Sequence, residues 1–136
     1  MQAAITASSF LAFLSYFAIG LGIMVIAAAI VAAITPHREI TLIRQGNIAA
    51  ATAFAGTLIG IALPLKSVIS NSVSLADAAI WGFVAAAVQI AAFLIARQLV
   101  AGKLSRSITD NVTAAGIFSA GVSVAIGLIN AAAMTP

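Results

Sequence analysis

Four long apolar runs separated by short polar segments dominate the pattern of this chain. The runs extend from about Ser9 to Ile34, Asn47 to Ile69, Leu75 to Ala96 and Val112 to Met134. A helix of about 20 apolar residues spans the hydrocarbon core of a bilayer, so each run is long enough to cross. The runs are continuous and do not alternate between polar and apolar positions, which favours helices over a β-barrel. The pattern predicts an all-α, polytopic membrane protein with four transmembrane helices in a single membrane domain, residues 1–136.

Composition supports the same class of protein. Hydrophobic residues make up 63% and charged residues 7% of the 136 positions, against about half and about a quarter in ordinary globular domains. Such a chain has too little polar surface to cover itself in water. It contains no cysteine, which excludes disulfides and thiolate chemistry. The net charge of +3 comes from scattered residues, so a nucleic-acid partner is not expected.

The distribution of charge predicts the orientation in the membrane. Five of the six basic residues fall in the segments 35–46 and 97–110, and Lys66 alone lies in the remaining loop. The positive-inside rule places these two segments in the cytoplasm and both termini in the periplasm. Residues 1–9 carry no Lys or Arg, unlike a secretory signal, so the first run is expected to be a retained helix.

The two basic segments carry apolar residues at helical spacing. Ile40 and Ile43 could share one face of the first segment, and Val100, Leu104 and Ile108 recur every four residues in the second. Each segment is therefore either a short helix lying in the headgroup layer or a solvated basic loop.

The same four-residue pattern occurs twice, 64 residues apart, at the start of the second and fourth runs. The first copy is Asn47, Ala50, Ala51 and Phe54, and the second is Asn111, Ala114, Ala115 and Phe118. This predicts a parallel duplication of a two-helix unit, with repeats at 9–69 and 74–134, because a unit with two spans returns to its starting side. Inverted repeats, by contrast, are typical of many transporters.

Several polar and small residues are candidates for a structural or functional role. Asn47 and Asn111 stand where an N-cap side chain would bond to a free backbone N–H, or where a pair of functional amides would face each other. Gln89 lies in mid-membrane, where it must bond to protein or face a hydrated path. Asn130, near the outer end of the fourth run, is interpreted in the same way. Small residues recur at four-residue spacing and predict helix packing faces, either within one chain or between chains: Gly56, Gly60, Ser119, Ser123 and Gly127. Because four thin helices enclose little interior, a homo-oligomer is favoured.

No reactive constellation can be assembled from the sequence. His37 is the single histidine, and Glu39 is the nearest carboxylate. A metal site needs several such ligands, so no metal or cofactor is expected and the protein is predicted not to be an enzyme. No ionisable residue lies deep in a span, which counts against ion-coupled transport.

The segment from Ile34 to Ser67, the stretch NVTAAGIFSAG and the ending INAAAMT carry a resemblance to a known family. They are similar to the YjfL-like bacterial inner-membrane family, a domain of unknown function numbered 350. The resemblance implies four membrane helices built from a duplicated unit, a location in the bacterial inner membrane, and an association with proteins like phage-shock protein A. Threonine usually follows the asparagine in this family, whereas Ile48 and Val112 take that place here.

Two functions are consistent with these observations. The first is a non-enzymatic, oligomeric inner-membrane protein that presents basic cytoplasmic loops to lipid headgroups or to a peripheral envelope-stress partner. Its expected surface consists of Arg38, Arg44, Lys103 and Arg106. The alternative is a small oligomeric channel or pore, lined by Gln89, Thr52, Ser119 or Ser123.

Overall fold

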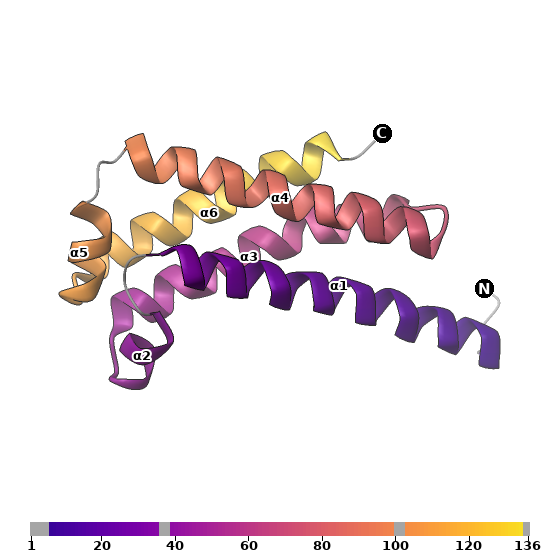
Figure 1. The fold of residues 1–136 in the computed structure, drawn as a ribbon, viewed down its shortest axis with the longest axis horizontal. Helices are drawn as coiled ribbons and strands as arrows, with labels where there is room; N and C mark the ends of the chain where they lie inside the picture. Colours follow the sequence, from indigo (N-terminus) through magenta and orange to yellow (C-terminus); the bar gives the residue numbers. More distant parts are fainter. Residues whose placement is uncertain (1–5, 36–38, 100–102, 135–136) are drawn as a thin grey trace.

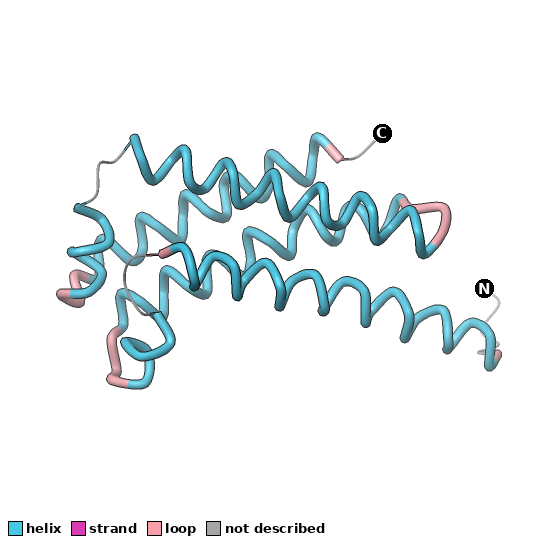
Figure 2. Tube along the Cα trace, viewed as in Figure 1, coloured by secondary structure: helices cyan, strands magenta, loops and turns pink. Residues whose placement is uncertain are grey.

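Four long helices and two short ones make up the described chain. The structure, a computed structural model, describes residues 6–35, 39–99 and 103–134. The long helices are α1 (Ala7–Ile34), α3 (Ile48–Asn71), α4 (Leu75–Leu99) and α6 (Thr113–Ala133), and the short ones are α2 (Glu39–Arg44) and α5 (Lys103–Thr109) (Figure 1). All four long helices are long and apolar enough to cross a membrane. The described residues contain no strand (Figure 2), so the predicted all-α class with four transmembrane helices is confirmed.

Local capping explains where two of the long helices begin. The Thr6 side chain accepts from the Ser9 backbone N–H, and the Ser9 side chain accepts from the Thr6 backbone N–H. This reciprocal cap begins α1 two residues earlier than the apolar pattern indicates. At α4, Ser74 Oγ accepts from the backbone N–H of Asp77 at 3.1 Å, the bond of an N-terminal cap. The Asp77 carboxylate accepts from Val73, one residue before the cap.

The long helices run in two opposite directions, with two helices in each. α1 and α4 run toward the end of the bundle where α2 and α5 lie, and α3 and α6 return from it (Figure 1). The first described residues of α1 and the last of α6 therefore lie at the opposite end. Both halves repeat the order long helix, short helix, long helix. The origin of the halves by duplication, with repeats at 9–69 and 74–134, stays a prediction.

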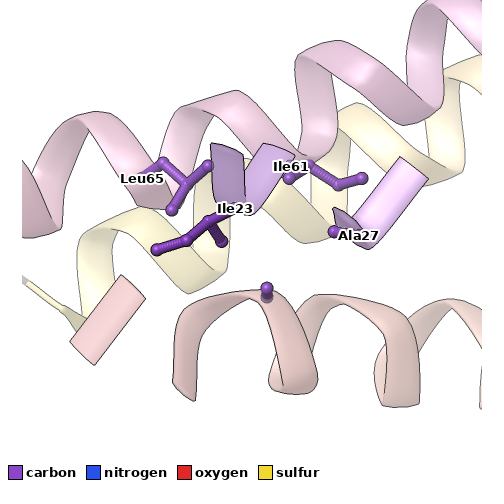
Figure 3. Packing of buried hydrophobic residues seen from close by; sticks show 5 residues of the cluster. Ile23, Ala27, Ile61 and Leu65 are labelled. Atoms are coloured by element: carbon purple, nitrogen blue, oxygen red, sulfur yellow. The ribbon is translucent and has the colours of Figure 1, made fainter. Parts of the chain in front are cut away.

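Helix α3 is the central element. Half of its most apolar 18-residue window is buried, against 22% for α1 and 28% each for α4 and α6. In mid-bundle, Ile23 and Ala27 of α1 face Ile61 and Leu65 of α3 (Figure 3), and Ala86 of α4 completes the cluster. The other helices thus cover half of this window of α3, whereas they leave most of α1 exposed.

Candidate functional site

The short helix α2 ends in a tight turn that feeds directly into α3. The N–H of Gly46 donates to the carbonyl of Ile43 at 3.0 Å, and the N–H of Asn47 donates to the carbonyl of Leu42 at 2.9 Å. Gly46 has φ +82°, which glycine adopts without steric cost. These are the two bonds of a Schellman motif with glycine in the left-handed position.

The short helix α5 ends in the same motif, built from different residue types. The N–H of Asn111 donates to the carbonyl of Ile108 at 3.0 Å, and the N–H of Val112 donates to the carbonyl of Ser107 at 2.9 Å. Asn111 has φ +60°, the one non-glycine residue with positive φ in the described chain. Asparagine is the usual substitute for glycine at this position. Asn111 therefore corresponds in conformation to Gly46, and not to its sequence twin Asn47.

The two asparagines consequently have different roles at the starts of α3 and α6. Asn47 is the N-cap of α3, and its Oδ1 accepts from the N–H of Ala50 at 2.8 Å. The prediction that Asn111 caps α6 is wrong. α6 begins one residue later, with Val112 as N-cap and no side-chain cap bond, because Asn111 is used to end α5.

Both asparagine side chains bond across to the other half of the chain. Asn47 Nδ2 donates to the carbonyls of Ile108 and Thr109 at 2.9 and 3.2 Å. Asn111 Oδ1 accepts from the N–H of Ala49 at 3.1 Å. The end of α5 and the start of α3 are thus joined by three hydrogen bonds that satisfy orphan groups of both helix termini.

Helix α5 turns its apolar side toward the protein. Ile108 is 2% exposed and packs in a cluster with Ala49, Ala50 and Ala53 at the start of α3. Leu42, Ile43, Leu104 and Ala115 pack around this cluster. Of the two alternatives for the basic segments, short helices are observed, but Ile43, Leu104 and Ile108 face the protein and not the headgroup layer. Ile40 remains exposed, and Val100 lies outside the described residues.

The predicted basic surface is described only in part. Arg44 closes α2 and Arg106 lies on α5, and both side chains are exposed at the same end of the bundle. Lys103 begins α5, whereas Arg38 lies outside the described residues. Arg97, which was not among the predicted site residues, lies near the end of α4 at the same end, and its side chain is half-buried.

The small residues pack α3 against α6 within one chain. A Cβ atom added at Gly56 would overlap the Cα and Cβ atoms of Ala120, and one at Gly127 would overlap the backbone of Gly60. One at Gly60 would lie 2.5 Å from the carbonyl oxygen of Ser123. The open question of whether these stripes pack inside the chain or between chains is thus settled for these glycines.

The buried side of α6 does not follow the strict four-residue spacing used for the prediction. It consists of Gly116, Ser119, Ser123, Gly127 and Asn130. Their spacings of three, four, four and three residues are those of one helix face. Strict spacing by four missed Gly116, whose added Cβ would overlap the backbone of Ala49. A helical-wheel pattern, applied to the same sequence, would have included it.

The mid-membrane amides bond α4 to α6. Gln89 Nε2 donates to the carbonyl of Ser123 at 3.0 Å, and Asn130 Nδ2 donates to the carbonyl of Ala85 at 3.0 Å and to Gln89 Oε1 at 3.5 Å. Both amide side chains, Gln89 and Asn130, are at most 5% exposed. Polar groups in the hydrocarbon region need such partners. In this conformation they lie inside the bundle and do not face a path between chains.

These features define a polytopic helical membrane protein with a packed interior and one hydrogen-bonded, basic end. Within the described residues, no group of three His, Cys, Asp or Glu side chains could hold a metal ion.

The chain belongs to the family described as Domain of Unknown Function (DUF350), which it matches over residues 4–134. It is 43% identical over 127 residues to the UPF0719 inner membrane protein YjfL of Escherichia coli strain K12. It has the same identity to the protein of that name in Escherichia coli O157:H7. In each case the match covers 93% of this chain and 96% of the relative. No solved structure matches. The chain is therefore a multi-pass inner-membrane protein of a family without an established function.

Proposed function

We propose that this protein is a non-enzymatic, oligomeric component of the inner membrane whose α2–α5 end binds lipid headgroups or a peripheral envelope-stress partner. The observation that carries the proposal is the set of three bonds made by Asn47 and Asn111. These bonds fix α5 on the start of α3, while the turn at Gly46 fixes α2 to the same point. Arg44 and Arg106 are both exposed at this end of the bundle, which supports a shared basic surface.

The charge of this surface suits an anionic partner. Each basic side chain near an anionic membrane surface contributes about 1 kcal/mol to attraction. Arg38, Arg44, Lys103 and Arg106 together would contribute about 4 kcal/mol if all four take part. By itself this corresponds to a dissociation constant of about 1 mM, so the basic residues would strengthen the binding of a peripheral protein with an acidic face together with other contacts. The partner suggested by the family resemblance is a protein like phage-shock protein A.

Neutralisation of the four basic residues tests the proposal. The chain with Arg38, Arg44, Lys103 and Arg106 all changed to Gln is reconstituted in vesicles of phosphatidylcholine, with and without 30 mol% phosphatidylglycerol. Co-sedimentation of a purified protein like phage-shock protein A is then measured. We expect the unmodified chain to increase co-sedimentation and the fourfold variant to lose at least tenfold in apparent affinity. Lys66→Gln, a neutralisation at the other end, serves as the control and should have no effect.

The outcomes separate the two kinds of partner. If co-sedimentation increases with vesicles of phosphatidylcholine alone, the partner contacts the protein directly. If it increases only when phosphatidylglycerol is present, the partner is held through lipid headgroups. If the unmodified chain and the fourfold variant gave equal co-sedimentation of the peripheral protein in both kinds of vesicle, the proposed surface would be refuted. Native mass spectrometry of the detergent-solubilised protein tests the oligomer, and a monomer alone at every detergent concentration would refute that part.

The alternative proposal, a small oligomeric channel, has less support. Three of its four expected lining residues, Gln89, Ser119 and Ser123, are at most 4% exposed within the bundle. The fourth, Thr52, bonds back to the carbonyl of Ile48 in its own helix. A channel would need a path between chains along other residues, and conductance in planar bilayers would reveal it.

A further inference from the structure

An apolar groove runs between α1 and α4 on the lipid-facing side of the bundle. Its main part has a volume of about 380 Å³ and is lined by residues of both helices, among them Ile26 and Ile30 of α1 and Ala87 and Leu94 of α4. A second part of about 210 Å³ continues it toward Ala18 and Ala79, and the two parts share Ile23, Ile26 and Phe83. The two parts thus form one continuous groove along the helix pair, open on its outer side.

The groove is longer than the depth of one leaflet. From Ala18 to Ile30 along α1, and from Ala79 to Leu94 along α4, a rise of 1.5 Å per residue gives about 18 to 22 Å. Half of the hydrocarbon core is about 15 Å thick. A single acyl chain that enters from the α2–α5 end would therefore lie along the groove for the full depth of its leaflet.

Arg97 lies on α4 just beyond the residues that line this groove. Ile90 and Leu94 line it, and Arg97 follows them at seven and three residues, which places it on the same face of α4 one turn further on. Its Nη1 atom is buried and has no hydrogen-bond partner among the described residues. A buried guanidinium donor left without an acceptor is costly, and the planar fork of arginine fits phosphate oxygens.

We propose that the α1–α4 groove and Arg97 form a binding site for one anionic glycerophospholipid. One acyl chain lies in the groove, and the phosphodiester accepts hydrogen bonds from the Arg97 guanidinium. An anionic headgroup is favoured because its phosphate charge is not offset by a cationic choline or ethanolamine. The site goes beyond the proposed function, since Arg97 is not one of the four residues of the partner surface.

Fluorescence quenching by brominated lipids measures occupancy of this groove directly. Trp81 is the only tryptophan, so Trp81→Phe combined with Ile26→Trp gives one reporter in the middle of the groove. Ile26 is 49% exposed and shared by both parts of the groove, so a larger side chain can be accommodated toward lipid. The reporter chain is reconstituted in phosphatidylcholine vesicles that contain either brominated phosphatidylglycerol or brominated phosphatidylcholine as a minor component.

We expect quenching to show about a fivefold preference for phosphatidylglycerol over phosphatidylcholine, the size expected for one basic side chain at an anionic headgroup. Arg97→Gln should abolish the preference, so that the two lipids quench about equally. The control Lys66→Gln, which also removes one positive charge, should preserve the preference. Ala91→Phe, which fills the groove from an exposed position of its lining, should reduce quenching by both lipids. The control Ala125→Phe adds the same ring to an exposed position of α6 and should have no effect.

Three outcomes would overturn the proposal. Equal quenching by the two lipids in the reporter chain with Arg97 intact would show that bulk lipid fills the groove without selection. A preference that survives Arg97→Gln would place the headgroup elsewhere. Protection of the reporter from both lipids would show that a second copy of the chain covers the groove. The assay contains no peripheral partner, and the recruitment assay leaves Arg97 intact, so the two proposals fail independently.

Discussion

Replacing Asn111 by alanine, glycine and serine tests whether this residue ends α5 or caps α6. In the structure Asn111 has φ +60° and accepts one bond from the N–H of Ala49. Alanine loses that bond, worth about 1 kcal/mol, and adds left-handed strain of about 1 to 2 kcal/mol. Glycine loses the bond but adopts the conformation freely. We therefore expect Asn111→Ala to cost about 2 to 3 kcal/mol. Asn111→Gly should cost about 1.5 to 2 kcal/mol, because glycine also adds about 0.5 to 1 kcal/mol of flexibility to the unfolded chain.

The same substitutions at Asn47 provide a matched comparison. Asn47 has φ −74°, so no left-handed strain arises there. Alanine loses the cap, about 1 kcal/mol, and the bonds to the carbonyls of Ile108 and Thr109, about 1 kcal/mol together. Glycine retains most of the cap energy but adds flexibility to the unfolded chain, about 0.5 to 1 kcal/mol. Alanine and glycine should thus be nearly equal at Asn47 and clearly different at Asn111.

The free energy of unfolding is measured for each variant by reversible titration with dodecyl sulfate in mixed micelles, followed by circular dichroism. Serine gives the decisive result, because it is a good N-cap residue but strained at positive φ. The structure predicts that Asn111→Ser is worse than Asn111→Gly, and that Asn47→Ser is the mildest change at Asn47. If Asn111→Ser proved milder than Asn111→Gly, Asn111 would be a true N-cap, and the register derived for this turn would be incorrect.

Three further predictions concern the bundle and its orientation. Gly127→Ala should destabilise the protein by about 1 to 3 kcal/mol, because the added methyl group overlaps the backbone of Gly60. The control Gly121→Ala, whose methyl group meets nothing within 4 Å, should be neutral or stabilising. Equal costs of the two changes in the same titration would contradict the α3–α6 contact. Gln89→Leu should cost only about 0.5 to 1.5 kcal/mol, the range of interhelical bonds in membranes, and a much larger loss would indicate a role in the bundle beyond its bond to α6. Because the chain has no cysteine, single cysteines introduced at Thr41 and Asn71 can be labelled in whole cells with a membrane-impermeant maleimide. We expect labelling from the periplasm at position 71 alone. Labelling at position 41 alone would reverse the predicted orientation.

Some properties of this protein are determined by the sequence itself. The four spans follow from apolar length, which is a local property because each helix satisfies its own backbone in lipid. The cap at Asn47 and the end of α1 before Pro36 likewise depend on neighbouring residues alone. The small-residue stripes could be recognised as packing faces, since close approach of helices needs small side chains wherever the partner comes from.

Only the tertiary structure decided how these elements are used. The twin asparagines hold the same place in the repeated pattern, but α5 ends one residue later, relative to the repeat, than α2 does. This shift puts Asn111 in the left-handed position that Gly46 occupies in the first half. The partner of the glycine stripe, the inward direction of Ile108 and the burial of the Arg97 Nη1 atom depend on how distant helices meet. A one-dimensional pattern shows which face of a helix must be covered, but the covering surface is chosen by the packing of the whole bundle.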